Sequence, residues 1–205
     1  MLLIEVGGFD GADSLKFYEK GYKVITFEPE RTLYAALSKK TAHLHDYRVV
    51  NKAVALTNGT THFYVCRAGG ASSILPFKSN TDLEEHWSKN RKDIQYSGLS
   101  YEVNTIRLDT FLEENSLTDV PIDYLHIDAQ GADLDVLKSL GIYAKNVCKG
   151  VVETCYSLEK AIYSTQRDDL LAVNHWLNSN GFTVESVVAN DPTGCECNVY
   201  FRRAE

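Results

Sequence analysis

The sequence predicts an α/β protein with a mostly parallel β-sheet. Short apolar runs alternate with amphipathic stretches along the chain, and this alternation is typical of parallel strands connected by helices. The last two apolar runs are separated only by a turn, and two successive strands without a helix between them cannot both be parallel. A length of 205 residues, at about 150 residues per domain, favours one domain that spans residues 1–205.

The first part of the chain contains two strand–helix pairs. Apolar runs at residues 2–6 and 23–27 predict two strands. Each is followed by a stretch with helical spacing, over residues 13–20 and 30–40, and Gly21 ends the first of these helices. These elements begin the parallel sheet.

The middle of the chain is less regular. Residues 48–55 and 60–65 predict two strands, and the Asn-Gly pair that begins at position 58 is a strong hairpin signal, so we expect these strands to pair with each other. Residues 82–92 are polar and helix-like, and residues 101–106 alternate as an edge strand would.

The second half returns to alternating helices and strands. Its expected helices cover residues 108–115, 134–140 and 167–180. Its expected strands cover residues 122–127, 147–153, 182–188 and 196–201. The last two strands flank a turn with proline and glycine and form the antiparallel hairpin.

Composition excludes several classes of protein. The chain has 21 Lys and Arg against 28 Asp and Glu, a net charge of −7, which argues against a nucleic-acid partner because such binding relies on cations at phosphates. No apolar run is long enough for a membrane span. The five cysteines are irregularly spaced and no leader peptide opens the chain, so we expect a cytoplasmic protein.

A glycine-rich loop follows the first predicted strand. Gly7, Gly8 and Gly11 allow a tight turn into the next helix and a close approach of a ligand to the backbone. Phe9 stands where a nicotinamide-binding loop would have its second glycine. The carboxylate of Glu5, at the end of the strand, suits a ligand with an ammonium group.

Two further acids follow predicted strands. Glu28 lies 21 residues after Gly7, where an acid accepts the ribose hydroxyls of an adenosine group. Asp128 ends the run at residues 122–127, two positions after His126, and therefore reaches the same carboxyl edge of the sheet. Asp133 is interpreted as a residue that starts a helix.

At these positions the chain resembles the FkbM family of S-adenosylmethionine-dependent methyltransferases, over nearly its whole length. The matching segments are residues 5–11, Glu28-Pro29, residues 51–54, Ser72-Ser73, residues 107–111 and residues 127–137. The last segment is the most specific, because it matches the family signature I-D-x-[EQ]-G-x-[ED]-x-x-V-L. Phe9 replaces a common Asn, and Ala129-Gln130 replaces the commoner Val-Glu, which puts a carboxylate role at position 130 in doubt.

The resemblance implies a Rossmann-like class I methyltransferase fold with a seven-stranded sheet that ends in an antiparallel hairpin. It also implies methyl transfer to a hydroxyl oxygen, often on a sugar in a glycan or glycosylated product. The residues expected to bind S-adenosylmethionine are Glu5, Gly7, Gly8, Gly11, Glu28, Asn51, Lys52, Ala53 and Asp128. Within this set, Glu28 holds the ribose, and Asn51, Lys52 and Ala53 border the adenine.

A base should assist transfer to a sugar hydroxyl, which is a poor nucleophile. Asp128 is the first candidate, and Glu153, at the end of the following strand, and His126 are the reserves. Asp128 and Glu153 could instead hold Mg²⁺ or Mn²⁺, since hard oxygen ligands suit these ions. The sequence does not separate the two roles.

The chain opens directly on an apolar run at residues 2–6, which suggests a domain cut from a longer polypeptide. Under the resemblance, the expected neighbour is a covalently linked glycosyltransferase domain. The alternative function is a nucleotide-binding Rossmann-like module without methyl transfer, either a reductase or a sensor. The lack of G-x-G-x-x-G and of a well-placed Tyr-x-x-x-Lys pair weighs against a reductase.

Overall fold

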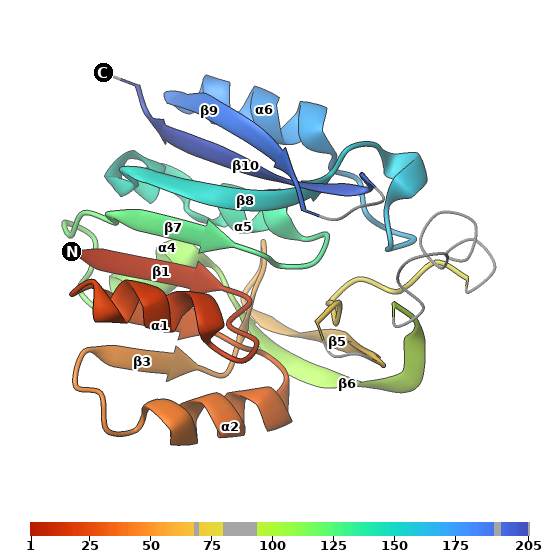
Figure 1. Ribbon diagram of the computed structural model, residues 1–205, viewed down its shortest axis with the longest axis horizontal. Coiled ribbons are helices and arrows are strands. Elements are labelled where there is room, and N and C mark those ends of the chain that lie inside the picture. The colour runs from red at the N-terminus through yellow and green to blue at the C-terminus, as the bar shows by residue number, and fades with distance from the viewer. Residues whose placement is uncertain (68–69, 80–93, 191–193, 205) are drawn as a thin grey trace.

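The computed structural model describes residues 1–67, 70–79, 94–190 and 194–204. Within these ranges, the main sheet has seven strands in the order β3-β2-β1-β7-β8-β10-β9 (Figure 1). They are β1 (Leu2–Val6), β2 (Lys23–Phe27), β3 (Tyr47–Val50), β7 (Tyr124–Ile127), β8 (Lys149–Cys155), β9 (Phe182–Ala189) and β10 (Glu196–Arg203). Strand β10 is antiparallel to both β8 and β9, whereas the other pairs are parallel. The mostly parallel sheet and its terminal hairpin are confirmed.

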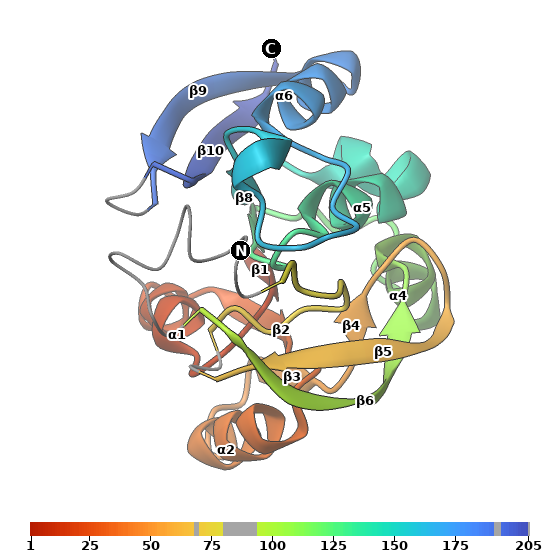
Figure 2. The same ribbon diagram turned by 90° about the vertical axis from the view of Figure 1, so that its right-hand side faces the viewer.

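Helices cover both faces of this sheet (Figure 2). They are α1 (Ala12–Glu19), α2 (Arg31–Thr41), α4 (Leu108–Glu114), α5 (Asp133–Ser139) and α6 (Leu170–Ser179), with short 3₁₀ turns at Gly141–Asn146 and Leu158–Lys160. Side chains alternate along a strand, so Leu3 packs with Phe17 of α1, whereas Ile4 joins the larger core with Leu112 and Val136. In the described part of the chain, no helix has the length and apolar character needed to cross a membrane.

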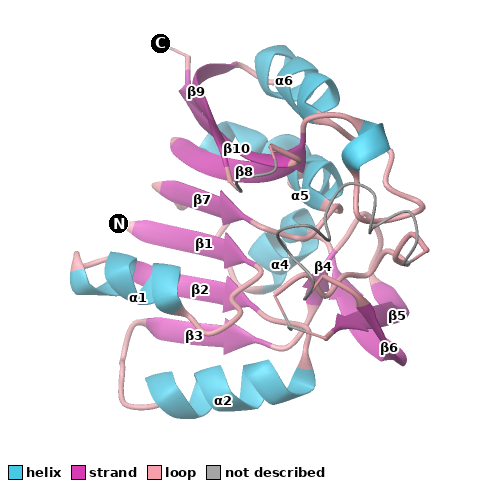
Figure 3. Cartoon of the chain, turned by 45° about the vertical axis from the view of Figure 1, so that its right-hand side comes forward, coloured by secondary structure: helices cyan, strands magenta, loops and turns pink. Residues whose placement is uncertain are grey.

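A second, smaller sheet lies beyond the carboxyl ends of the parallel strands. It contains β4 (Ala53–Val54), β6 (Tyr96–Ile106) and β5 (Gly59–Cys66), in that order. Figure 3 shows the arrowheads of β1, β2, β3 and β7 all pointing toward this side of the molecule. Ala53, Phe63 and Val103 form its small buried core, with Ile74 packed against them. The small sheet therefore lies next to the carboxyl edge of the main sheet, which is where ligands bind in open α/β sheets.

The middle of the chain differs from its sequence prediction. The run at 48–55 is two strands in different sheets, because the chain leaves the main sheet between β3 and β4. The predicted hairpin at position 58 is wrong, since β5 pairs with β6. The run at 101–106 belongs to β6, which lies between β4 and β5 and is no edge strand. The helix expected at residues 82–92 lies outside the described residues.

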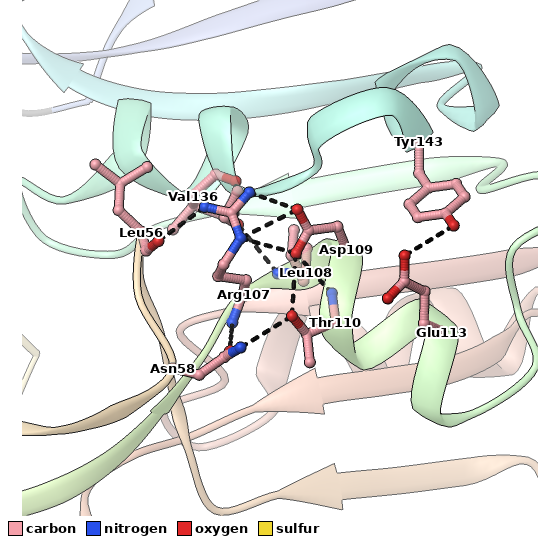
Figure 4. A network of polar contacts seen from close by, with 10 residues as sticks. Leu56, Asn58, Arg107, Leu108, Asp109, Thr110, Glu113, Val136 and Tyr143 are labelled. Carbon is pink, nitrogen blue, oxygen red and sulfur yellow. Dashed lines mark hydrogen bonds and ion pairs between the residues drawn. The ribbon is translucent and has the colours of Figure 1, made fainter.

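The junction between the two sheets is fixed by a polar network around Arg107 (Figure 4). Arg107 pairs with the carboxylate of Asp109, and its Nη1 donates to the Leu56 carbonyl at 2.8 Å. Asn58 accepts a hydrogen bond from the Arg107 backbone N–H at 2.8 Å and donates to Thr110 Oγ1 at 3.0 Å. These bonds hold the turn before β5 against the start of α4, and they thereby fix the small sheet next to the main sheet.

Candidate active site

The glycine loop after β1 joins three segments. The N–H groups of Gly7 and Gly8 both donate to the Phe27 carbonyl at 3.0 Å. Gly7 has φ +91°, and a Cβ there would lie 1.9 Å from the Asp128 carbonyl oxygen. Gly11 has φ +76° and caps the start of α1. Glycine is therefore required at position 7 both by its backbone angle and by the approach of the turn that follows β7.

Glu28, directly after β2, presents a buried carboxyl group. Its two oxygens accept hydrogen bonds from the backbone N–H groups of Phe9 at 2.7 Å and Glu30 at 2.8 Å. Burial raises the pKa of Glu28 to about 7, and these two hydrogen bonds offset only part of the effect. Each carboxylate oxygen offers two lone-pair directions, so Glu28 retains the capacity to accept hydrogen bonds from a ligand.

Asp128 and Glu153 lie on either side of one amide. Nε2 of Gln130 donates to Asp128 Oδ1 at 2.5 Å and to Glu153 Oε2 at 2.8 Å. Asn190 donates to the other oxygen of Glu153. Burial and the negative charge of Asp128 raise the pKa of Glu153 well above its ordinary value. Glu153 therefore holds its proton more tightly than an ordinary glutamate does. Asp128 lines the cleft, so it is the better placed of the two to act as a base.

Asp133 organises the turn between β7 and α5. Its carboxylate accepts hydrogen bonds from the N–H groups of Ala129 at 2.6 Å and Gly131 at 2.9 Å. Burial and the charge of Asp128 raise the pKa of Asp133 to about 7. Its position at the start of α5 agrees with the helix-start interpretation.

An open cleft lies between the carboxyl edge of the main sheet and the small sheet. The cleft contains about 610 Å³ of empty space, with the open solvent at its mouth included. Of the predicted residues, the cleft wall includes Gly7, Glu28, Lys52, Ala53 and Asp128. The other lining residues are Val6, Phe9, Phe27, Pro29, Leu33, Val54, Phe63, Gly70, Ser72, Ser73, Ile74, Ala129, Gln130 and Ala132.

Glu5 and His126 form a separate buried pair on the β1–β7 boundary. One oxygen of Glu5 accepts a hydrogen bond from Thr26 Oγ1 at 2.6 Å, and the other lies 3.4 Å from His126 Nδ1. Burial lowers the pKa of His126, but the hydrogen bond and charge of Glu5 outweigh it, so the pKa is raised. This pair supports the loop at Gly8, whose Cβ position is 3.5 Å from Glu5 Oε2, rather than lining the cleft.

Asn51 braces the turn that carries Glu28. Its side-chain amide donates to the carbonyls of Glu28 at 2.8 Å and Pro29 at 3.2 Å. Lys52 and Ala53 follow it into the cleft wall. The three neighbours therefore divide into one supporting residue and two that a ligand can touch.

The Asp128–Glu153 pair does not fit a divalent metal ion. The N–H groups of Gln130 lie between the two carboxyl groups, and Asn190 donates to the remaining oxygen of Glu153. Amide donors repel a cation, and a Mg²⁺ site needs oxygen ligands there. Across the described ranges, no three His, Cys, Asp or Glu side chains gather as a metal site. The sequence expectation of a metal at this pair thus finds no support in the structure.

Asn190 is a site residue that sequence reasoning missed, the role of Gln130 was left in doubt, and the contact of Tyr163 with Gln130 was not predicted. The Tyr163 hydroxyl lies 2.9 Å from Gln130 Oε1 and 2.7 Å from the Ala71 carbonyl. Tyr163 and Asn190 come from segments far along the chain, so no local pattern marks them. The one available signal was the signature itself, in which position 130 is restricted to Glu or Gln.

Comparison with known proteins identifies the family. A family model described as a methyltransferase FkbM domain matches residues 5–184. The chain belongs to the FkbM methyltransferase family. No curated protein matches the sequence. Membership in the FkbM family supports methyl transfer that depends on S-adenosylmethionine as the general activity of this chain.

Solved methyltransferase structures share the FkbM chain's fold. The ribosomal protein L11 methylase from Lactobacillus delbrueckii subsp. bulgaricus is 11% identical with a TM-score of 0.51, and the match covers 100% of this chain and 70% of that one. Magnesium protoporphyrin IX methyltransferase from Synechocystis PCC 6803, solved with bound S-adenosylmethionine, is 8% identical with a TM-score of 0.53 and the same coverages of 100% and 70%. At these identities the likeness shows the fold alone, and it confirms the Rossmann-like class I methyltransferase architecture.

Proposed function

We propose that this protein is an S-adenosylmethionine-dependent O-methyltransferase whose acceptor is a sugar hydroxyl in a glycan or glycosylated product. The observation that carries the proposal is that the carboxylates of Asp128 and Glu28 line one cleft. Family membership supplies the methyl-transfer reaction, and a carboxylate beside the transfer site suits a hydroxyl acceptor, because the oxygen must lose its proton.

The residues of the cleft fit the cofactor. Glu28 can accept hydrogen bonds from two ribose hydroxyls and keep those from the backbone, since each carboxylate oxygen has a second lone pair. Leu33, Val54 and Phe63 give an apolar surface in the same cleft, which suits a flat adenine ring. Lys52 and Ala53 border this surface, whereas Glu5 supports the glycine loop from behind.

In the proposed mechanism the cofactor supplies a methyl group on a positively charged sulfur, ready for in-line displacement. The chain's contribution is placement and proton removal. Asp128 would accept the proton of the acceptor hydroxyl as the carbon–oxygen bond forms and the methyl–sulfur bond breaks, with S-adenosylhomocysteine as the leaving group. Gly7 brings the glycine loop within contact of the Asp128 backbone. Holding the two reactants together accounts for much of the acceleration in such a displacement.

The test is an Asp128→Asn variant assayed with tritiated S-adenosylmethionine on a panel of methyl glycosides. The amide is nearly isosteric with the carboxylate but cannot take a proton, so turnover should fall by about 100-fold or more. Calorimetric affinity for S-adenosylhomocysteine should stay within about threefold of the wild type. Asp119→Asn, at an exposed position, is the matched control and should leave turnover unchanged.

Near-wild-type turnover of Asp128→Asn at saturating acceptor would make Asp128 a structural residue and would contradict its assignment as the base. Binding of NADPH in preference to S-adenosylmethionine would favour the nucleotide-binding module instead.

We also propose that residues 1–205 form one domain, that this domain works in the cytoplasm, and that a glycosyltransferase domain is linked to it. An ordinary start codon at Met1 in the parent reading frame would contradict a linked domain upstream of this residue.

A further inference from the structure

We propose that Gln130 is a positioning residue whose side-chain amide cross-links Asp128 and Glu153, so that Asp128 is held by one oxygen and offers the other to the acceptor hydroxyl. This inference rests on the proposed function, because it assigns how the base of that reaction is held. Gln130 itself lines the cleft beside Asp128, which places the cross-link at the transfer site.

The orientation of the Gln130 amide is determined by its neighbours. Its Nε2 has two hydrogens, and carboxylates are acceptors, so the amide nitrogen must face Asp128 and Glu153 at 2.5 and 2.8 Å. Its Oε1 faces the hydroxyl of Tyr163 at 2.9 Å. A glutamate at this position would have the same shape, but without a proton it could not donate to either carboxylate. In this chain, the amide therefore supplies two donors that the glutamate commoner at this position in the family could not supply.

The backbone of Gln130 is held in an unfavourable conformation. Gln130 has φ +53° and Gly131 has φ +87°, so two successive residues adopt left-handed angles. Left-handed angles are unfavourable for residues with a Cβ and persist where surrounding contacts enforce them, often at functional sites. Ser73 Oγ donates to the Gln130 carbonyl at 2.6 Å, and a Cβ at Gly131 would lie 2.4 Å from the Tyr163 ring. These contacts turn the Gln130 side chain back toward the strand ends.

Several ionisable groups surround this cross-link. Asp133 from the start of α5, Glu153 from β8, Glu196 from β10 and the Tyr163 hydroxyl all interact with the Asp128–Glu153 region. Each carboxylate that ionises here raises the cost of ionising the next. A neutral double donor between Asp128 and Glu153 reduces this repulsion where the reaction needs one carboxylate to stay ionised. The cross-link thus fixes the position of Asp128 and also reduces the repulsion between Asp128 and Glu153.

The test compares Gln130→Glu with Gln95→Glu, a control whose side chain pairs with Arg67 outside the cleft. With the best methyl glycoside from the panel, Gln130→Glu should lower kcat by about tenfold or more. It should also move the acidic limb of the pH–rate profile to higher pH by about one unit. ¹³C NMR should show the titration midpoint of Glu153 rising by a similar amount. Gln95→Glu should leave all three quantities at their wild-type values.

A double variant, Gln130→Glu with Glu153→Gln, separates positioning from folding. It restores one amide between positions 130 and 153 and the wild-type net charge, so the melting temperature should recover, but Asp128 has lost the donor at position 130 and kcat should stay low. Recovery of kcat together with stability would overturn the inference, as would an unchanged Glu153 titration in Gln130→Glu. The NMR measurement needs no acceptor, so the inference can fail while methyl transfer stands. If the wild type does not bind S-adenosylmethionine, the proposed function itself is contradicted.

Discussion

At Glu28, protein burial and ligand binding act on one carboxyl group in opposite directions. Burial favours the protonated form and raises the pKa to about 7. Two ribose hydroxyls that donate to the carboxylate would favour the ionised form and lower that pKa. Binding below neutral pH must then release a proton from Glu28, which couples cofactor affinity to pH.

We therefore expect S-adenosylhomocysteine affinity to increase about tenfold between pH 6 and pH 8, and then to level off, because Glu28 is already ionised above its pKa. Glu28→Gln should flatten this dependence and weaken binding at pH 8 by about 1–3 kcal/mol, the usual cost of unpaired buried hydroxyls. Calorimetry at three pH values measures both effects. Glu19→Gln on the exposed face of α1 is the control, and a Glu28→Gln profile that parallels the wild type would show that the ribose lies elsewhere.

Side-chain direction explains which site residues the sequence could predict. Glu28 and Asp128 follow parallel strands, and the shared carboxyl edge of such strands brought them into one cleft as predicted. Glu5 lies inside β1, so its side chain alternates with that of Val6 and points to Thr26 and away from the cleft wall. Gln130 could not be assigned in advance, because its role depends on a left-handed backbone angle that no sequence pattern marks.

At the scale of elements, the loop from β1 to α1 and the turn from β7 to α5 pack directly on each other. Their contact depends on Gly7, where the backbone has φ +91° and the space for a side chain is taken by the Asp128 carbonyl. Gly21, after α1, has a similar φ of +84° with nothing within 4 Å of its Cβ position. The two glycines therefore share a conformational requirement but differ in crowding.

Gly7→Ala and Gly21→Ala should consequently separate the two effects. Gly21→Ala carries only the cost of a left-handed alanine, about 1–2 kcal/mol. Gly7→Ala must also displace the Asp128 turn and should cost at least about 2 kcal/mol more, with loss of cofactor binding. Urea unfolding at pH 7 measures both free energies. Equal losses of stability would mean that the Asp128 turn can move away without cost.

Strand partners were predicted less well than strand positions. The Asn-Gly pair fixed a bend before β5, but a bend does not determine which strand completes the pair. Burial of Phe63 and Val103 in one small core favours β6 as the partner, although it comes much later in the chain. Alternation over residues 101–106 indicates one buried face, and a central strand has the same pattern as an edge strand when one face of its sheet is solvated.

At the scale of the molecule, several buried groups share one direction of pKa change. The pKa values of Glu28 and Asp133 are both raised to about 7, chiefly by burial, and that of Glu153 is raised well above its ordinary value. In the unfolded chain these carboxyl groups ionise near pH 4. They therefore stabilise the fold fully below about pH 4, and this contribution to the free energy of unfolding is lost as the pH rises through about 7.

The free energy of unfolding should thus be larger at pH 6.0 than at pH 8.5, by about 1–3 kcal/mol. His126, whose pKa is also raised, acts in the same direction. Urea denaturation at the two pH values measures the difference, and Asp133→Asn should reduce it. A free energy of unfolding that increases toward pH 8.5 would contradict the burial of these protonated groups.

The pairing of β1 with β7 also determines when in its synthesis the protein can first bind a ligand. The N–H of Leu2 donates to Asp123 at 2.6 Å across 121 positions of sequence, and Val6 lies opposite Ile127. A nascent chain that ends before β7 can build β1, β2 and β3 but lacks the turn that carries Asp128. Contacts between such distant segments form late. Cofactor present during translation therefore cannot protect the early part of the chain from proteases, and the cleft appears only after both halves of the sheet have joined.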